Sequence, residues 1–131
     1  MRVVFDTNIF VSAFVLPGSR AEAALIRVVE GKDRLIVSKP IIDELLAVLA
    51  RKFSRHREEL ARLAVFLAEV AELVHPEHKI DILDDDADNR ILECAVAGRA
   101  DMVVTGDRAV LTLGKYEDIP IIALSDYLGK T

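Results

Sequence analysis

The sequence predicts an α/β fold: a single three-layer α/β/α domain over residues 1–131 with a mostly parallel central sheet. Short runs of β-branched and other apolar residues alternate along the chain with longer stretches whose apolar residues recur at helical spacing. This alternation is typical of strand–helix–strand units, in which neighbouring strands are parallel. With 131 residues, 52% of them hydrophobic, the chain can bury one such core and is too short for two ordinary domains.

The first strand and the first long helix are marked by their end residues. The apolar run Val3–Phe5 predicts a buried strand that stops at polar residues. Ser19 and Glu22 have the spacing of a capping box, and the apolar stripe after them predicts a helix that ends at Gly31.

The middle of the chain predicts a second strand, two helices and a weak third strand. The apolar run Leu35–Val37 is closed by Ser38, and Pro40 fits the first turn of the helix that follows. Ser54 is expected to cap a further, largely apolar helix. The weak strand is expected at Leu73–Val74.

The last third of the chain predicts one helix between strands and a short helix at the end. Apolar residues over Ile91–Val96 predict a helix that Gly98 ends. Strands are expected at Met102–Val104 and at Ile119–Ala123, and Ser125 is expected to begin the terminal helix.

Cysteine usage and hydropathy indicate where the protein resides. Cys94 is the only cysteine, so no intramolecular disulfide can form and a reducing compartment is expected. No run approaches the roughly 20 apolar residues of a membrane span, and the N-terminus does not resemble a signal peptide. We therefore expect a cytoplasmic protein. Cys94 lies on the apolar side of its helix and is expected in the core rather than as a nucleophile.

The net charge of −5 argues against a broad basic face for nucleic acid, but charge is unevenly distributed along the chain. Residues 81–88 carry five aspartates and no basic residue. A basic run without an acid lies between positions 51 and 57 and is either a solvated helix end or a contact for substrate phosphates. Its members are Arg51, Lys52, Arg55 and Arg57.

Four acids are expected to meet at one edge of the sheet. Asp6 and Asp107 each follow a strand, and functional side chains collect beyond the carboxyl ends of parallel strands. Glu44 and Asp88 lie in the first turns of helices that start near the same edge. Four carboxylates in one crevice repel one another strongly, so they need either a cation or several raised pKa values. Mg²⁺ or Mn²⁺ suits such oxygen ligands and can activate water against a phosphodiester.

Each acid taken alone also has a purely structural interpretation. Asp88 fits a helix cap, Glu44 a solvated helix position, and Asp107 a turn residue after Gly106. Residues 6–8 fit the cap of a short first helix. The functional interpretation depends on the joint placement of the four acids.

The same residues resemble the motifs of the PIN domain family, in the right order and nearly from end to end. Residues 3–9 (VVFDTNI), with Ser12 beyond them, look like the family's opening, and residues 38–45 (SKPIIDEL) are similar to its second motif. Residues 85–89 (DDADN) and 100–107 (ADMVVTGD) resemble the third and fourth. Each motif is weak alone and the ordered set is strong. It looks closest to the VapC-like toxin components of toxin–antitoxin pairs.

The resemblance implies a role for each acid and for three polar neighbours. The metal ion would be held by Asp6, Glu44 and Asp88, with Asp107 completing the acidic cluster directly or through water. Ligands or bound waters would be oriented by Asn8, Ser12 and Thr105.

The third motif departs from the family at one position. The family often has proline between the acids of this motif, where this chain has Asp86. Which of Asp85, Asp86 and Asp88 faces the pocket is therefore open. Asp88 is favoured because Asn89 follows it as in the motif.

The resemblance implies a metal-dependent endoribonuclease that cleaves single-stranded RNA with Mg²⁺ or Mn²⁺, as the toxin of a toxin–antitoxin pair. Its expected partners are RNA, a small antitoxin protein and further copies of itself, in a homodimer or higher homo-oligomer. Apolar surface near the helices at residues 40–71 would serve for docking or for dimerisation.

Two other functions fit parts of the pattern. A phosphate-accepting signalling domain is also a small α/β fold with clustered acids, but it usually needs an acid before Asp6 and a lysine after the strand at 119–123. A PIN-like binding module without catalysis is disfavoured because all four acids are present.

The three histidines are not expected to bind a metal. His75 and His78 lie in a predicted surface loop, where no helix holds both imidazoles on one face, and His56 is remote in sequence.

Overall fold

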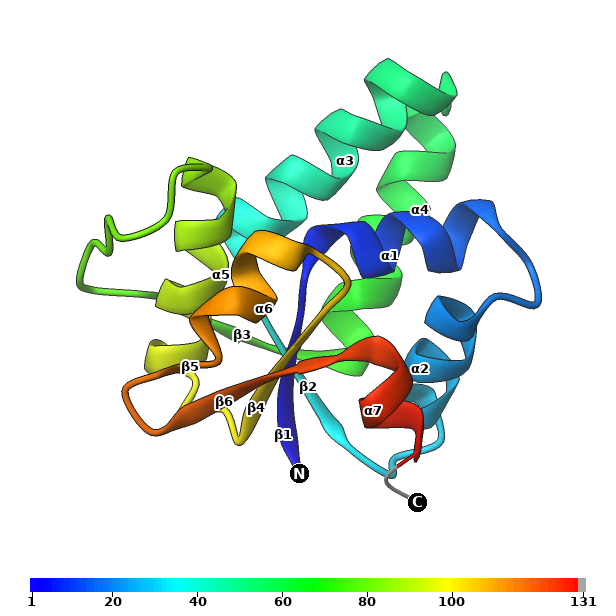
Figure 1. Ribbon diagram of the computed structural model, residues 1–131. Helices are drawn as coiled ribbons and strands as arrows, with labels where there is room; N and C mark the ends of the chain where they lie inside the picture. The colour runs from blue at the N-terminus through cyan, green and yellow to red at the C-terminus, as the bar shows by residue number, and fades with distance from the viewer. Residues whose placement is uncertain (130–131) are drawn as a thin grey trace.

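The computed structural model describes residues 1–129 and confirms a mixed α/β fold with a mostly parallel central sheet (Figure 1). The sheet has six strands in the order β3-β2-β1-β4-β6-β5. Its strands are β1 (Arg2–Phe5), β2 (Arg34–Ser38), β3 (Ala71–Val74), β4 (Met102–Thr105), β5 (Lys115–Tyr116) and β6 (Ile119–Ala123). The central strand β1 pairs in parallel with β2 on one side and with β4 on the other. Outside these, β3 pairs in parallel with β2, and β6 pairs in parallel with β4. Among the described strands only β5 is antiparallel to its neighbour.

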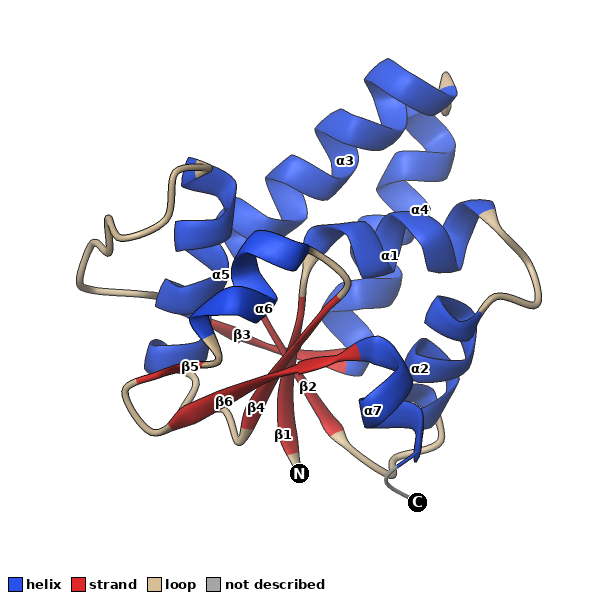
Figure 2. Cartoon of the chain, viewed as in Figure 1, coloured by secondary structure: helices blue, strands red, loops and turns tan. Residues whose placement is uncertain are grey.

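Helices cover both sides of this sheet. They are α1 (Thr7–Val15), α2 (Arg20–Val29), α3 (Lys39–Phe53), α4 (Arg57–Val70), α5 (Asp86–Ala97), α6 (Arg108–Leu113) and α7 (Leu124–Gly129). On one side α5 packs across β1, β2 and β4, while α2 and α7 pack together on the other side (Figure 1). Helices α3 and α4 pack on each other and project beyond the carboxyl ends of the strands (Figure 2).

The central strands are buried on both faces. Val3, Val4 and Phe5 of β1 are 0% exposed, and the apolar residues of β2 and β4 are buried too. Consecutive apolar residues are what a strand needs when helices cover both of its faces. This arrangement explains why short apolar runs, without alternation, predicted these strands from the sequence.

The structure differs from the sequence-based expectation around Ser54. Ser54 does not cap α4; it ends α3 in the left-handed region at φ 51°, and the backbone N–H of Arg55 bonds to the carbonyl of Leu49. The chain reverses direction at this residue, and α4 starts after His56. A serine hydroxyl signals a helix start only when the backbone before that helix is extended.

Three short elements were not predicted as such. Helix α1 appeared only as an alternative interpretation of residues 6–8, and its buried side chains include Ile9, Phe10 and Val11 in succession, so they form no stripe. Helix α6 and strand β5 are too short for a periodic pattern. Within residues 1–129 no single helix has the length and apolar composition of a membrane span; α1 and α2 meet both criteria only as a pair bent by 100°.

Gly98, at the end of α5, allows this helix to lie close to β2. A Cβ atom at position 98 would lie 2.4 Å from Cγ2 of Ile36, a fully buried side chain. Helix α5 carries acidic residues at its other end, so this close approach also fixes their distance from the sheet.

We predict that Gly98→Ala lowers the free energy of unfolding by about 1–3 kcal/mol, because the added methyl group overpacks the contact with Ile36. Urea denaturation measures the change. Gly106→Ala is the matched control, since a Cβ there meets nothing within 4 Å and its φ is not positive. Equal stability of the two variants would contradict the role given to Gly98.

Candidate active site

Strands β1 and β4 deliver two acids to the same edge of the sheet. Asp6 follows β1, and its backbone N–H bonds to the carbonyl of Val104 at 3.0 Å. Asp107 lies two positions after the last residue of β4, Thr105. Each aspartate also begins a helix: Asp6 Oδ1 accepts from the N–H of Asn8 at 3.3 Å, and Asp107 Oδ1 accepts from the N–H of Ala109 at 2.8 Å. The cap expected at residues 6–8 is present, Asp107 caps a helix rather than only forming a turn, and these structural roles coexist with the clustering of the two acids.

Thr105 connects the two acids. Its buried hydroxyl donates to Asp6 Oδ2 at 2.6 Å and accepts from the backbone N–H of Asp107 at 3.0 Å. This side chain fixes the Asp6 carboxylate relative to the turn after β4. The geometry suits a residue that orients a ligand.

Asp88 lies beside this pair in the first turn of α5. Its side chain is 8% exposed. Burial raises the pKa of Asp88 to about 7, and the negative charges of Asp6, Asp107 and Asp85 act in the same direction. No hydrogen bond from residues 1–129 contributes to this pKa. Asp88 is thus a buried acid, surrounded by other acids, with no donor of its own to stabilise its charge.

Burial also raises the pKa of Asp6 above its ordinary value. The hydrogen bonds from Thr105 and from the N–H of Asn8 oppose this effect, while the charges of Asp107 and Asp85 add to it. Asp6 thus accepts two hydrogen bonds that favour its charged form, whereas Asp88 accepts none.

The structure distinguishes the three acids of the third motif. Asp85 is exposed and caps α5, because its Oδ1 accepts from the N–H of Ala87 at 3.0 Å. Asp86 is exposed and pairs with Arg90 at 3.3 Å. Asp88 is the buried one and faces Asp6. The capping role considered for Asp88 therefore belongs to Asp85.

Asn89 has a role that sequence reasoning missed. Its fully buried side chain accepts from the N–H groups of Ile82 and Leu83 at 3.2 and 2.9 Å and donates to the carbonyl of Leu83 at 3.0 Å. Asn89 thereby ties the loop before α5 to the helix. The sequence signal was its place directly after Asp88, but nothing in that spacing reveals its partners.

Glu44 lies to one side of the buried acids. This half-buried residue of α3 lines a hollow of about 230 Å³ together with Thr7, Asp86 and Arg90. The charges that raise the pKa of Asp88 do not include that of Glu44. The sequence reasoning also missed Arg90, which places a cation in this hollow and pairs with Glu93 at 2.8 Å.

Asn8 and Ser12 line a second hollow. Asn8 touches Asp6 through its backbone N–H, and its side chain is exposed. The hollow measures about 600 Å³ and includes Gly106 and Asp107. The consecutive residues Thr7 and Asn8 therefore line different hollows, and Asp6 directly precedes them in the chain.

Three of the four predicted ligands, Asp6, Asp88 and Asp107, lie close enough for their charges to interact, and Glu44 lines the hollow that contains Thr7 and Asp86. Within the described part of the chain, no three His, Cys, Asp or Glu side chains are arranged to share one ion as they stand. The donors nevertheless fit a hard cation, because carboxylate oxygens repel one another here and Asp88 has no hydrogen-bond donor. A shared ion would be held by Asp6, Asp88 and Asp107, with Glu44 as the further carboxylate.

The basic run lies away from these acids. It occupies the end of α3 and the start of α4, at the tip of the helical projection (Figure 1). Glu44 and Arg51 are seven positions apart on α3, which is a rise of about 10 Å along the helix. Arg55 pairs with Glu59 at 3.3 Å, and the other three cations of the run are exposed: Arg51, Lys52 and Arg57.

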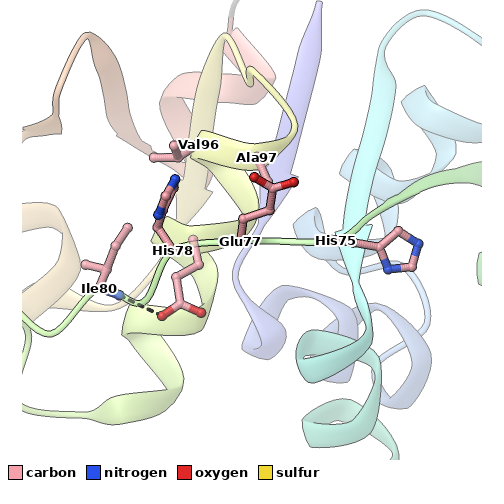
Figure 3. A pocket seen from close by; sticks show the side chains of 7 residues that line it. His75, Glu77, His78, Ile80, Val96 and Ala97 are labelled. Atoms are coloured by element: carbon pink, nitrogen blue, oxygen red, sulfur yellow. Dashed lines mark hydrogen bonds between the residues drawn. The ribbon is translucent and has the colours of Figure 1, made fainter.

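The histidines and the cysteine stay outside the site. His75 and His78 border a surface hollow of about 330 Å³, and their rings are turned away from each other (Figure 3). Glu93, which also lines it, bonds to the N–H of Ile80 at 2.8 Å. Cys94 is buried in the core as expected, and burial raises the pKa of its thiol to about 12.

Comparison with known proteins identifies the family. Residues 2–109 match the model of the PIN domain. The chain belongs to the PIN domain family. An uncharacterised protein of Methanocaldococcus jannaschii is 25% identical to this PIN domain over 117 residues, which cover 86% of this chain and 75% of the relative.

Solved structures share the fold at low sequence identity. VapBC2 from Rickettsia felis, solved with a DNA fragment from its promoter, has a TM-score of 0.66 at 17% identity and covers 94% of this PIN domain and 98% of its own chain. VapBC-1 from nontypeable Haemophilus influenzae has a TM-score of 0.64 at 17% identity, with coverages of 95% and 99%. FitAcB from Neisseria gonorrhoeae has a TM-score of 0.57 at 17% identity, and the match covers 94% of this chain and 98% of that one.

We predict that Asp88→Asn stabilises the metal-free protein above neutral pH. The pKa of Asp88 is about 7 in the folded state and near 4 when unfolded, so ionisation costs stability as pH rises from 4 through 7. Solvent at the open edge of the sheet screens part of the repulsion, so we expect a gain of roughly 1 kcal/mol, or about 3–6 °C in Tm.

Thermal melts in EDTA at pH 4 and pH 8 measure this effect. The Tm of the variant should exceed that of the wild type at pH 8 and equal it at pH 4. Asp118→Asn, at an exposed position in the β5–β6 turn, is the control and should change neither melt. A gain of equal size at both pH values would show that the charge of Asp88 is not its cause.

Proposed function

We propose that this protein is a metal-dependent endoribonuclease that cleaves single-stranded RNA in the cytoplasm, as the toxin of a toxin–antitoxin pair. The observation that carries the proposal is the buried pair of carboxylates, Asp6 and Asp88, beside Asp107 at the carboxyl edge of the sheet. Acids gathered in such a place are stabilised by a bound cation, which balances their charge without protonating them. Membership of the PIN domain family supports the assignment to nucleases.

The ligands of Mg²⁺ or Mn²⁺ would be Asp6, Asp88 and Glu44, with Asp107 contributing directly or through water. When bound, the ion supplies positive charge for a phosphodiester and activates water for in-line attack. The protein itself positions the ligands. Thr105 holds the Asp6 carboxylate in one orientation, and Asn89 fixes the loop that carries Asp85.

RNA is proposed as the substrate in single-stranded form. Asp6 and Asp88 are buried at the sheet edge, and a flexible strand can bring a phosphate to such a place more easily than a duplex. Of the basic run, Arg51 and Lys52 lie on α3, the same helix as Glu44, so they are proposed as contacts for phosphates distant from the cleaved one.

An antitoxin protein is proposed as the partner. The structural neighbours include VapBC and FitAcB assemblies. In this chain, Phe14, Leu63 and Phe66 line an apolar hollow of about 380 Å³ where α1, α3 and α4 meet. This surface is also suited to pairing between two copies of the chain, and a homo-oligomer stays part of the proposal.

We predict that the protein cleaves unstructured RNA in Mn²⁺ or Mg²⁺, that EDTA abolishes cleavage, and that the double variant Asp6→Asn, Asp107→Asn lowers the rate by about a hundredfold or more. A gel assay on a labelled oligoribonucleotide measures the rate. The variant Asp118→Asn, Asp126→Asn removes the same charge at exposed positions and should cleave like the wild type.

Two outcomes would count against this assignment. Metal-dependent cleavage that survives the Asp6→Asn, Asp107→Asn change would refute the site. RNA binding with no turnover in Mn²⁺ would favour a binding module that retains the fold without catalysis.

A further inference from the structure

The larger of the two hollows has walls of mixed chemistry. It measures about 600 Å³ and lies between the start of α1, the turn from α1 to α2, and the turn after β4. Its apolar lining comes from Ile9, Leu16 and Leu124. Its volume falls in the range of about 300–1,000 Å³ that small-molecule sites occupy.

Leu16 is an apolar side chain held at the surface. It is 55% exposed, although apolar residues of this size are usually buried. Its position is fixed by backbone hydrogen bonds, because its N–H bonds to the carbonyl of Ser12 at 2.9 Å and its carbonyl accepts from the N–H of Ser19 at 3.2 Å. The turn therefore presents a preformed apolar surface to whatever enters the hollow.

Polar groups stand around this apolar surface. The exposed amide of Asn8 offers both a donor and an acceptor, and Ser12 adds a hydroxyl one turn further along α1. Arg20, the exposed first residue of α2, brings a positive charge to the same hollow. Apolar faces, hydrogen-bonding edges and an attached anion are the features of a nucleotide.

The hollow is continuous with the acid cluster. Asp107 belongs to both, and Asn8 is two residues from Asp6. A strand whose phosphate lies at the acids would thus have an adjacent base within reach of the hollow. We propose that this hollow holds one nucleobase next to the cleaved phosphate, its face against Leu16 and Leu124 and its edge on Asn8 and Ser12.

This inference rests on the proposed nuclease function, and its test uses ligands that cannot be cleaved. The full-length chain in Mg²⁺ is titrated with each nucleoside 5′-monophosphate and with ribose 5-phosphate, and amide and methyl NMR shifts are followed. At least one nucleotide should bind more tightly than ribose 5-phosphate and shift the Leu16 methyl and Ser12 amide signals. Equal affinity for ribose 5-phosphate and all four nucleotides would overturn the base site.

Leu16→Gln and Ser12→Ala should each weaken binding of that nucleotide about fivefold, the effect of losing one ordinary contact. The controls are Leu73→Gln, a 47% exposed leucine on β3, and Ser125→Ala, an exposed serine on α7; both should bind as the wild type does. Unchanged affinity in Leu16→Gln and Ser12→Ala would refute the proposal.

Cleavage of random-sequence RNA in Mn²⁺ separates the two proposals. A chain that binds nucleotides in the hollow but cuts no RNA would refute the nuclease function and keep the base site. If the wild type and Leu16→Gln both cut RNA and show the same base preference beside the cut, the base site is refuted and the nuclease function stands.

Discussion

The repulsion among carboxylates at the carboxyl edge of the sheet is the constraint on which this molecule depends. Asp6 and Asp88 are both buried there, and the charges of Asp107 and Asp85 add to their repulsion. Such an arrangement destabilises the folded state, so other contacts must enforce it. The parallel pairing of β1 with β4 places Asp6 near Asp107, and the close contact of Gly98 with β2 places α5, and with it Asp88, against the same strands.

Structural and chemical roles coincide in these acids. Asp6 and Asp107 start α1 and α6, and Asp85 starts α5, so three of the elements at this edge begin at a carboxylate. A carboxylate oxygen has more than one lone pair, and a capping bond leaves capacity for a further ligand. A short polar segment can therefore end a strand, begin a helix and form a site at once. Asp88 has no such second role, which makes its burial the most informative feature of the site.

The extent to which the sequence predicted this structure differs between elements for physical reasons. Strands buried on both faces and helices with one apolar stripe leave a local pattern, so β1, β2, β4 and α2 were predictable. Helix α1 buries successive residues, so its sequence shows no apolar stripe from which it could be predicted. The hydrogen bond of Thr105 to Asp6 joins residues 99 positions apart, and the partners of Asn89 depend on how a loop packs, so neither geometry follows from spacing. The choice among Asp85, Asp86 and Asp88 likewise required the orientation of α5.

The distribution of positive charge around the site completes the argument. The chain has a net charge of −5, and its basic run lies at the far tip of α3 and α4. Close to the acids, Arg90 is already paired with Asp86 and Glu93, so much of its charge is balanced. Arg20 borders the larger hollow and is exposed. A polyanion approaching this edge would therefore meet two exposed arginines, Arg20 and Arg108, and a bound cation would add to their attraction. In the proposed nuclease, the cation that balances the charge of the acids would also attract the substrate to them.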